Sequence, residues 1–504
     1  MKSFHNIIEC AKQNGTAYIY GKNLDGVDCC LSFSETISKA EQLAKLLTRS
    51  GLLHNEVIGF RAPNCIEWVV WDIAALIGGF VLQVFPENLS STSTLDLLNK
   101  HGFRFILDSM LPLNTSVDGM AGLGLNHKAL KLRNTSTSVI ADSGIYTRVY
   151  SSGSTGELKG LNISAPGAAN IVDQFIAAYE INDQDSTLIF LPLSNNQQRL
   201  IIYASLGQGC NIHITEFTHV FHLCKTVKPT FIVAPPIFYE NLIRIFPDNE
   251  NTQSNIHMGL GGNIRFLITG MAAIDKYILE YYQSRGLPLY EAYGITEAGM
   301  VSWNTPRKNK TGSVGYPISK DDIKLSKEGE ILVQKANPLC TGYFHNPDDT
   351  QDTKTFFEGT VYTGDIGFFD NEGFLFLNGR KKNIVISKNG IKYHPESIEK
   401  GINEHPNIEW SILIQTDDCQ LVVYAKTSTE PSDEDRTILT DYVKDLLAIM
   451  VPTLKLHKLL LGVEGPSESD GTLTRNLKLN RPAIRARIIK SLENSLIINK
   501  EELA

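Results

Sequence analysis

The chain of 504 residues is too long for one ordinary core, and at roughly 150 residues per domain it predicts two to four domains. Its composition, 42% hydrophobic and 20% charged, excludes disordered and fibrous proteins. A net charge of -8 argues against a nucleic-acid partner, because phosphate backbones are bound by basic surfaces. The eight cysteines form no C-x-x-C pair and no zinc-spaced cluster with histidine, which is typical of the reducing cytoplasm.

The N-terminal segment, residues 1–15, lacks the apolar core of a signal peptide and predicts an amphipathic helix. The most apolar stretch, residues 68–85, contains Asp72 and Gln83 and is divided by the glycines at 78 and 79. A buried helix followed by a buried strand fits this stretch better than a membrane span.

Short β-branched runs alternate with helical patterns over most of the chain. Residues 186–193, 230–236 and 264–270 are continuous apolar runs of strand length. Strands of this kind indicate a sheet that is buried on both faces. We therefore predict the α/β class, with a large multi-sheet N-terminal body of mostly parallel strands.

After Asp321 the pattern changes to short antiparallel hairpins, with residues 370–373 as a turn, and this predicts a β-rich subdomain. A small α+β C-terminal domain follows from about Lys381, so we place the two domains at 1–380 and 381–504. The elements expected in the small domain are strands at 383–390, 411–416 and 421–426 and helices at 394–406 and 437–451.

Residues 149–160, with the sequence VYSSGSTGELKG, form a loop rich in serine, threonine and glycine. Such residues let backbone N–H groups and hydroxyls approach an anion closely, and Lys159 adds a positive charge. The loop is no Walker A sequence, because Leu158 and Gly160 stand where that motif needs glycine and a hydroxyl residue. Taken alone, it fits a plain polar turn better than a phosphate site.

Four further motifs follow this loop along the chain: YEAYGITEAG (290–299), VYTGDIG (361–367), NGRKKNIVISKNGIKYHPESIE (378–399) and TLTRNLKLNRP (472–482). In this order and at these separations, the five motifs resemble those of the adenylate-forming (AMP-binding, acyl-CoA synthetase-like) superfamily. The resemblance covers essentially the whole chain. Residues 266–299 and 311–318 are most similar to the branch of fatty-acyl-CoA synthetases and standalone acyl-activating ligases.

The resemblance implies an AMP-forming acid–thiol ligase that uses ATP and Mg²⁺. A carboxylate attacks the α-phosphate and expels pyrophosphate, and the acyl group of the resulting acyl-AMP passes to the thiol of CoA or of a carrier-protein phosphopantetheine. Two anions must meet, so catalysis is mostly positioning and charge neutralisation. Residues 1–380 would then be the adenylation domain, and residues 381–504 a mobile domain carrying a catalytic lysine.

By the same resemblance, the loop wraps the β- and γ-phosphates, Tyr293 stacks on adenine, and Asp365 and Arg380 hold the ribose hydroxyls. Thr296 contacts the α-phosphate and Glu297 ligates Mg²⁺. The residues implied in ATP or AMP binding are Ser151, Ser152, Gly153, Ser154, Thr155, Gly156, Lys159, Glu291, Ala292, Tyr293, Gly294, Asp365 and Arg380.

Local sequence leaves other interpretations of these residues open. Thr296 and Glu297 also fit a capping pair at the start of a helix, behind a buried tyrosine. Asp365 fits a turn or cap, and Arg380 fits a surface position.

Lys478 occupies the position of the family's catalytic lysine. The resemblance therefore implies a catalytic set of Lys478, Thr296 and Glu297. A cation there offsets the repulsion between carboxylate and phosphate; a solvated lysine is the alternative. Asn383 stands at the hinge position, where the family normally has an acidic residue or lysine. Asparagine tolerates unusual φ values, which fits the dihedral change of a rotating domain.

The acyl pocket is implied between the strand that precedes YGITE and the helix that follows the two prolines at 235 and 236. An acid that is apolar beyond its carboxylate is expected there. The residues implied are Phe238, Gly270, Met271 and Ala272 for the pocket and Lys388, Gly390 and Lys392 for the thiol tunnel. The two lysines would meet CoA or carrier phosphates, and two solvated lysines on a turn are an equal alternative.

Several positions depart from the family pattern, among them Leu158, Asn195 and Asn196. One alternative is an amino-acid-activating enzyme, although Ala234 and Pro235 stand where such enzymes usually place an aspartate. Another is a degenerate, non-catalytic nucleotide-binding protein of the same fold. The expected partners are a small carboxylic acid and possibly an acyl or peptidyl carrier protein, with no nucleic acid and no membrane span.

Overall fold

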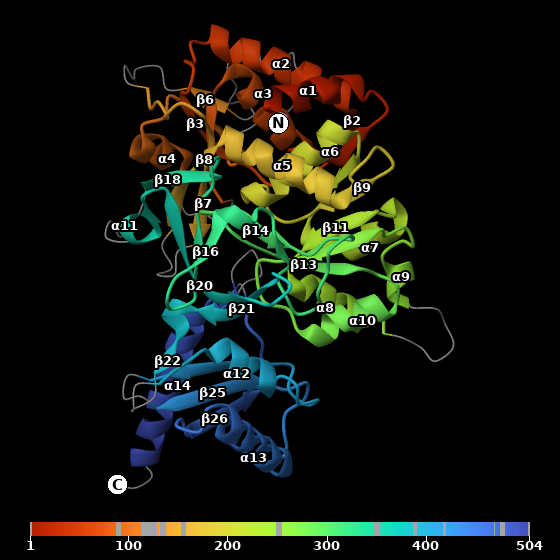
Figure 1. The fold of residues 1–504 in the computed structure, drawn as a ribbon. Coiled ribbons are helices and arrows are strands. Elements are labelled where there is room, and N and C mark those ends of the chain that lie inside the picture. Colours follow the sequence, from red (N-terminus) through yellow and green to blue (C-terminus); the bar gives the residue numbers. More distant parts are fainter. Residues whose placement is uncertain are drawn as a thin grey trace. The chain divides into compact units, whose positions relative to one another are not determined.

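The computed structural model describes residues 3–86, 92–111, 129–131, 138–152, 158–247, 255–345, 352–386, 391–416, 420–467, 469–473 and 479–501. The chain divides into two compact units (Figure 1). Unit 1 comprises Met1–Gly153, Glu157–Asp322 and Gln334–Val361, and unit 2 comprises Ser154–Gly156, Ile323–Val333 and Tyr362–Ala504. Residues 323–333 and 362–380 thus belong to unit 2, while the domain boundary after residue 380 and the hinge at Asn383 stay predictions.

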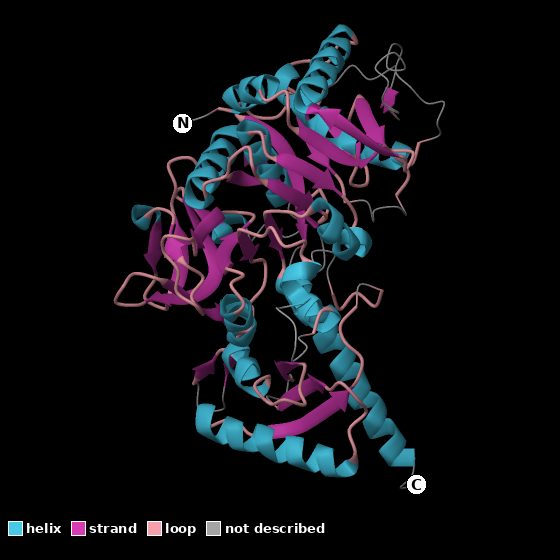
Figure 2. Cartoon of the chain, turned by 90° about the vertical axis from the view of Figure 1, so that its right-hand side faces the viewer, coloured by secondary structure: helices cyan, strands magenta, loops and turns pink. Residues whose placement is uncertain are grey.

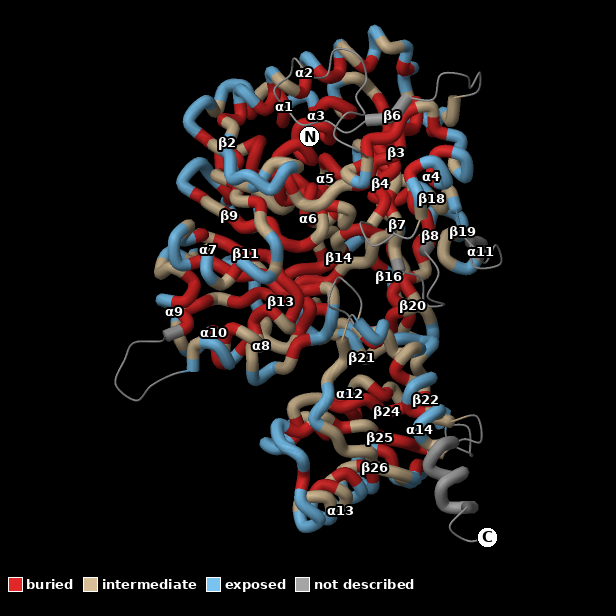
Figure 3. Tube along the Cα trace, turned by 180° about the vertical axis from the view of Figure 1, so that it is seen from behind, coloured by how far each residue is buried: buried red, intermediate tan, exposed pale blue. Residues whose placement is uncertain are grey.

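A nine-stranded sheet forms one half of unit 1, in the order β15-β14-β13-β12-β11-β9-β10-β1-β2. Its strands from β13 to β1 are parallel. The tube along β11 and most of β13 is buried (Figure 3), as the continuous apolar runs predicted. The bounds are β1 Tyr18–Lys22, β2 Asp28–Ser32, β9 Ser186–Ile189, β10 Asn211–Ile214, β11 Phe231–Ala234, β12 Phe266–Thr269, β13 Leu289–Ile295, β14 Gly299–Trp303 and β15 Tyr316–Pro317.

A seven-stranded sheet forms the other half of unit 1, in the order β18-β8-β7-β4-β3-β5-β6. Strands β7, β4, β3 and β5 are parallel, whereas β8 and β18 join one edge as antiparallel strands. The bounds are β3 Val57–Arg61, β4 Val81–Val84, β5 Phe105–Asp108, β6 Ala129–Lys131, β7 Ile145–Ser152, β8 Leu158–Ser164 and β18 Cys340–His345.

Helices cover both sheets of unit 1. The first of them confirms the expected N-terminal amphipathic helix, and α3 followed by β4 confirms the buried helix and strand at residues 68–85. Gly79, at a φ of +68°, ends α3. In the described part of the chain no helix is long and apolar enough to cross a membrane. The bounds are α1 Phe4–Gln13, α2 Phe33–Arg49, α3 Ile66–Gly78, α4 Thr94–His101, α5 Ala165–Tyr179, α6 Asn196–Gln208, α7 Val220–Val227, α8 Pro236–Ile245, α9 Asn255–Gly259, α10 Lys276–Ser284 and α11 Asp352–Thr355.

A buried ion pair joins α6 to α3 inside unit 1. Arg199 donates from Nε to Asp72 Oδ2 at 3.0 Å and from a terminal nitrogen to Thr147 Oγ1 of β7 at 2.8 Å. Its guanidinium also lies 5.1 Å from the ring of Trp68. Because both charges are almost completely buried, the pair depends on these additional contacts for its stability. It holds α6, which begins just after β9, against the seven-stranded sheet.

Unit 2 begins with strands β16 (Ile323–Leu325), β17 (Glu330–Val333), β20 (Thr360–Phe369) and β21 (Leu375–Arg380). The first two residues of β20 belong to unit 1 and pair with β19 (Phe356–Phe357). Strands β20 and β21 form an antiparallel hairpin. Its turn lies at the predicted residues, where the amide of Gly373 donates to the carbonyl of Asp370 at 3.0 Å.

The C-terminal part of unit 2 is a three-stranded sheet with helices on both faces, as Figure 2 shows. Helices α12 and α13 pack on one face, while Ile484 and Ile488 of α14 pack on the other. The bounds are β22 Val385–Ile386, β23 Lys392–Tyr393, α12 Pro395–Ile402, β24 Trp410–Gln415, β25 Leu421–Lys426, α13 Asp433–Met450, β26 Leu456–Gly462 and α14 Arg481–Glu501.

Three predicted elements of the small domain have different bounds in the structure. The helix expected at 394–406 is α12, which ends at Ile402. The strand expected at 383–390 is only two residues long within the described residues, because Lys381–Asn383 form a short 3-10 helix. The helix expected at 437–451 begins at Asp433, because Ser432 and Asp435 form a capping box.

Candidate active site

The carboxyl ends of β9, β11, β12 and β13 meet at one edge of the nine-stranded sheet. From β9 the chain passes to β10 on one side and returns to β11 on the other. Open α/β sheets bind ligands at such a point, where neighbouring strands lead in opposite directions. The predicted site segments around Phe238 and Met271 follow the ends of β11 and β12, and Tyr293 lies near the end of β13.

The loop after β12 carries the predicted pocket residues Gly270, Met271 and Ala272. A Cβ on Gly270 would lie only 2.9 Å from the carbonyl oxygen of Ala292, so glycine lets this loop pass against β13. Met271 has a φ of +73°, in the left-handed region that non-glycine residues seldom adopt. Strained residues of this kind cluster at functional sites. Met271 is half-buried and Ala272 is exposed.

Phe238 lies in α8 and is fully buried among aromatic rings. Its ring centroid is 5.1 Å from that of Phe190 and 5.3 Å from that of Phe221. Met271 packs against the same apolar cluster. The structure thus brings two predicted pocket residues, Phe238 and Met271, to one cluster beside the strand ends.

The YGITE motif forms a hairpin, with β13 ending at Ile295 and β14 beginning at Gly299. A Cβ on Gly294 would lie 2.6 Å from the carbonyl oxygen of Gly299, so this position requires glycine. Thr296 and Glu297 lie half-buried on the turn. The alternative of a capping pair at a helix start is therefore wrong, because the chain returns as an antiparallel strand.

Strands β7 and β8 form the two stems of the predicted phosphate loop. Ser151 pairs with Lys159 and Tyr150 with Gly160 across the stems. The predicted residues Gly153, Ser154, Thr155 and Gly156, and the side chain of Ser152, lie outside what the structure describes. Ser151 and Lys159 share one face of the hairpin, because side chains of paired residues lie on the same side of a sheet.

Tyr343 of β18 connects the phosphate-loop stem to the YGITE turn. Its hydroxyl donates to Glu297 Oε1 at 3.1 Å, and the Lys159 Nζ lies 5.3 Å from its ring centroid. Burial, and then the nearby Glu297 carboxylate, raise the pKa of Tyr343 well above its usual value, so the phenol keeps its proton and remains a donor. The sequence did not predict a role for Tyr343, because nothing in TGYFHNP distinguishes it from a packing aromatic residue.

Glu297 fits a position beside a magnesium ion. Among the described residues, Tyr343 is its one hydrogen-bond partner, and that bond engages only Oε1. No group of three or more acidic, histidine or cysteine side chains gathers in the described parts of the chain. Proteins often hold Mg²⁺ through one or two carboxylates while substrate phosphates complete its coordination, and the half-buried Glu297 carboxylate fits that role.

In unit 2 the two predicted ribose contacts lie together. Asp365 and Arg380 pair across β20 and β21, and Arg380 Nε lies 2.8 Å from Asp365 Oδ1. Asp365 is buried, whereas the Arg380 side chain is 45% exposed. Asp365 lies inside β20, so the alternative of a turn or cap aspartate is wrong, whereas the exposed Arg380 also fits the alternative of a surface arginine.

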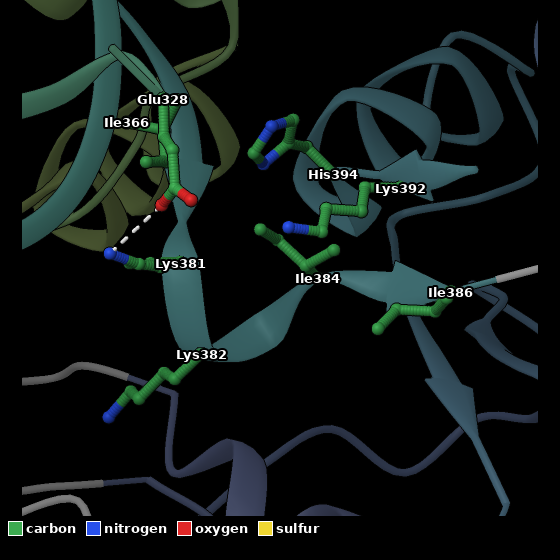
Figure 4. Close-up of a pocket in the computed structure, with 8 residues that line it drawn as sticks. All are labelled: Glu328, Ile366, Lys381, Lys382, Ile384, Ile386, Lys392 and His394. Carbon is green, nitrogen blue, oxygen red and sulfur yellow. Dashed lines mark ion pairs between the residues drawn. The ribbon is translucent and has the colours of Figure 1, made fainter. Parts of the chain in front are cut away.

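The predicted hinge residue Asn383 donates from Nδ2 to Glu396 Oε1 of α12 at 2.6 Å. Beside it lies a cavity of about 610 Å³, formed within unit 2 (Figure 4). Its lining residues are Glu328, Ile366, Lys381, Lys382, Ile384, Ile386, Lys392 and His394. Figure 4 shows Lys381 turned toward Glu328, with which it forms an ion pair at 3.1 Å.

Three predicted residues of unit 2 fall outside the described residues: Lys388, Gly390 and the catalytic candidate Lys478. Lys392 is exposed on β23 and lines the cavity. The chain on either side of the Lys478 segment is joined by an antiparallel bridge between Leu473 and Leu479. Arg481, at the start of α14, contacts Glu399 of α12.

At the level of sequence, the chain resembles a known family and several of its members. The family described as AMP-binding enzyme matches residues 9–344, more than half of the chain. A long-chain-fatty-acid–CoA ligase of Mycobacterium bovis is 24% identical over 481 residues, covering 81% of this chain and 79% of the relative. A 2-succinylbenzoate–CoA ligase of Listeria monocytogenes is 27% identical over 460 residues, covering 88% of this chain and 93% of the relative.

Among solved structures, o-succinylbenzoate CoA synthetase of Bacillus subtilis, in complex with an acyl-adenylate intermediate, matches with a TM-score of 0.73. It is 20% identical, and the match covers 95% of this chain and 97% of that one. At this identity the likeness shows a shared fold, which agrees with the predicted α/β body and second domain. The family match, over more than half of the chain, establishes that the chain belongs to the AMP-binding enzyme family.

Proposed function

We propose that the protein is an AMP-forming acid–thiol ligase, which adenylates a carboxylic acid with ATP and passes the acyl group to CoA. The observation that carries this proposal is the meeting of Lys159 and Glu297 at one tyrosine, between the phosphate-loop stem and the YGITE turn. The curated relatives are named CoA ligases, and the Bacillus subtilis enzyme has also been solved with ATP and a magnesium ion.

The residues of unit 1 would neutralise charge around the triphosphate. Ser151, Lys159 and the loop between them would hold the β- and γ-phosphates, and Thr296 would contact the α-phosphate. Glu297 would hold Mg²⁺, which when bound offsets the negative charge of the phosphate oxygens. Tyr293, with the Glu291–Gly294 strand segment around it, would stack on the adenine.

The residues of unit 2 would orient the nucleotide and the reacting carboxylate. Asp365 would accept both ribose hydroxyls, and Arg380 would hold Asp365 in place and make the second ribose contact. Lys478 would lie between carboxylate and α-phosphate and reduce their repulsion. Asn383 would absorb the dihedral change when the small domain rotates for the second half-reaction.

The residues proposed for the acyl pocket favour a carboxylic acid that is apolar beyond its carboxylate, such as a fatty acid. Phe238 and Met271 belong to one apolar cluster and present no charge. Glu240, the nearest acid in this helix, is a poor partner for a substrate ammonium, because burial raises its pKa and favours the neutral form. This argues against amino-acid activation.

The acceptor is proposed to be CoA, with a phosphopantetheinylated carrier protein as the second candidate. Both present the same thiol arm, and Lys388 and Lys392 flank the loop with Gly390 that would line its tunnel. The exposure of Lys392 leaves its ammonium accessible to a phosphate.

Pyrophosphate exchange with ATP and a panel of carboxylic acids of increasing length tests the proposal. Exchange with at least one acid is expected, followed by thioester formation when CoA or a carrier protein is added. Lys478→Ala should reduce exchange by about 10²-fold, while thioester formation from pre-made acyl-adenylate is far less affected. Folded protein that exchanges with no acid would instead support a non-catalytic nucleotide-binding protein.

A further inference from the structure

Strand β18 holds the phosphate-loop stems through two consecutive aromatic residues on opposite faces of the sheet. On one face, a Cβ on Gly160 would lie 2.4 Å from the ring of Phe344, so this ring lies directly over the stem. Phe344 also lies 5.6 Å from the Tyr150 ring and 4.7 Å below the Arg148 guanidinium. On the other face lies Tyr343.

Tyr343 is placed by its register. It pairs with Leu161 of β8, so Lys159, two residues before Leu161, lies diagonally across on the same face. The ammonium of Lys159 is 5.3 Å from the ring centroid, within the range of a cation–π contact. Lys159 itself is buried, since only 8% of it is exposed. The ring is also packed against Phe356, with centroids 5.2 Å apart.

The hydroxyl of Tyr343 reaches the other sheet of unit 1. It donates to Glu297 Oε1 at 3.1 Å, on the turn between β13 and β14. One rigid side chain therefore contacts a cation on the loop stem with its face and a carboxylate on the YGITE turn with its tip. A donor to one carboxylate oxygen fixes the rotation of the group and leaves the second oxygen directed outward.

We propose that Tyr343 is a positioning residue for adenylation, which orients the Glu297 carboxylate toward the metal and holds the Lys159 ammonium at the phosphates. This rests on the proposed function, in which Glu297 holds Mg²⁺. The hydroxyl and the ring act separately: the hydroxyl sets metal affinity, and the ring sets the contact with the triphosphate.

Tyr343→Phe removes only the hydroxyl, so it isolates the contact with Glu297. In the presence of ATP, we expect the dissociation constant of Mn²⁺, measured by electron paramagnetic resonance, to rise by about 10- to 100-fold. The rate of pyrophosphate exchange should be largely restored at saturating metal. Tyr343→Leu also removes the ring and should raise the KM for ATP even at saturating metal.

Tyr179→Phe is the matched control. Tyr179 is buried in α5, and its hydroxyl donates to the backbone carbonyl of Asn304 at 2.7 Å rather than to Glu297. The Tyr179→Phe variant should be less stable than the unmodified protein, but its dissociation constant for Mn²⁺ should be unchanged. A p-aminophenylalanine at position 343 keeps the ring and places an N–H donor where the hydroxyl stood, so it should retain tight Mn²⁺ binding, which preserves the test if Tyr343→Phe does not fold.

Unchanged Mn²⁺ binding in folded Tyr343→Phe would overturn the proposal, as would an equal loss in Tyr179→Phe. Loss of Mn²⁺ binding in the p-aminophenylalanine variant would also overturn it. The proposed function fails separately, if the unmodified protein catalyses no pyrophosphate exchange. If pyrophosphate exchange at limiting metal requires Glu297 but is unchanged in Tyr343→Phe, the proposed function stands and the role of Tyr343 is rejected.

Discussion

At the scale of single residues, Glu297 has a chemical environment that a structural role does not require. It lies on a two-strand turn rather than at a helix start, so it caps no helix. Its contact is a phenol that remains protonated, and this favours a carboxylate held in a fixed direction.

Glu297→Gln keeps the shape of the side chain and removes its charge. We expect the fold to remain intact while pyrophosphate exchange falls on the order of 10²-fold, with no rescue by added carboxylic acid. The test measures the rate of pyrophosphate exchange at saturating and at limiting carboxylic acid, together with the melting temperature of the variant. Normal exchange with a lower melting temperature would show that Glu297 serves only the turn.

Only part of the candidate site could be predicted from the sequence. The pairing of Asp365 with Arg380 follows once the two motifs are recognised, because both flank one hairpin. The contacts of Tyr343 could not be predicted, because they join residues 159, 297 and 343, which are distant along the chain. Such contacts depend on how two sheets meet, and no local pattern contains that information.

At the scale of elements, β21 and α12 approach each other closely at Gly379. This residue has a φ of +129°, and a Cβ there would lie 2.4 Å from Glu396 Oε2. The same Glu396 accepts the hydrogen bond from Asn383. Gly379 therefore permits the contact that holds the predicted hinge against α12.

Gly379→Ala should displace Glu396, break the bond to Asn383 and increase amide hydrogen exchange in α12. Gly342→Ala is the control, because Gly342 has a similar φ of +139° but a Cβ there would have nothing within 4 Å of it. It carries the backbone strain without the clash. Equal rates of amide hydrogen exchange in α12 for both variants would show that the contact between Gly379 and Glu396 does not stabilise this helix.

The elements themselves were predicted best where their pattern was longest. The buried strands β9, β11 and β12 stand where continuous apolar runs indicated them, because a strand covered on both faces needs apolar residues throughout. Element ends were predicted less well, as at α13. The capping box of Ser432 adds a full turn to this helix without any apolar residue to mark it.

At the scale of the whole molecule, we expect stability at acid pH to depend on two half-buried imidazoles of unit 1. Burial lowers the pKa of His101 and of His213 to about 4. His213 stacks on Tyr20 with centroids 4.5 Å apart, and His101 stacks on Phe103 at 5.4 Å. Both rings are neutral in the folded state, whereas an unfolded histidine titrates near 6.5.

Between about pH 6.5 and pH 4 the unfolded chain therefore binds more protons than the folded chain, and stability rises with pH. The melting temperature should fall as the pH is lowered through this window. His213→Phe, which keeps an aromatic ring for stacking, should make the melting temperature depend less steeply on pH. His219→Gln, at an exposed position, should leave this pH dependence unchanged. An identical slope in His213→Phe and the unmodified protein would contradict this origin of the acid sensitivity.

The ion pair between Asp72 and Arg199 has a consequence for how this sequence can change over time. Loss of either partner strands the other charge in the interior, at a cost of about 3–5 kcal/mol, a large part of the stability of a typical domain. Replacement of both by apolar residues of similar volume can be neutral or better. The two codons are therefore linked: each single step is strongly deleterious, and only a paired change leads to an equally stable descendant.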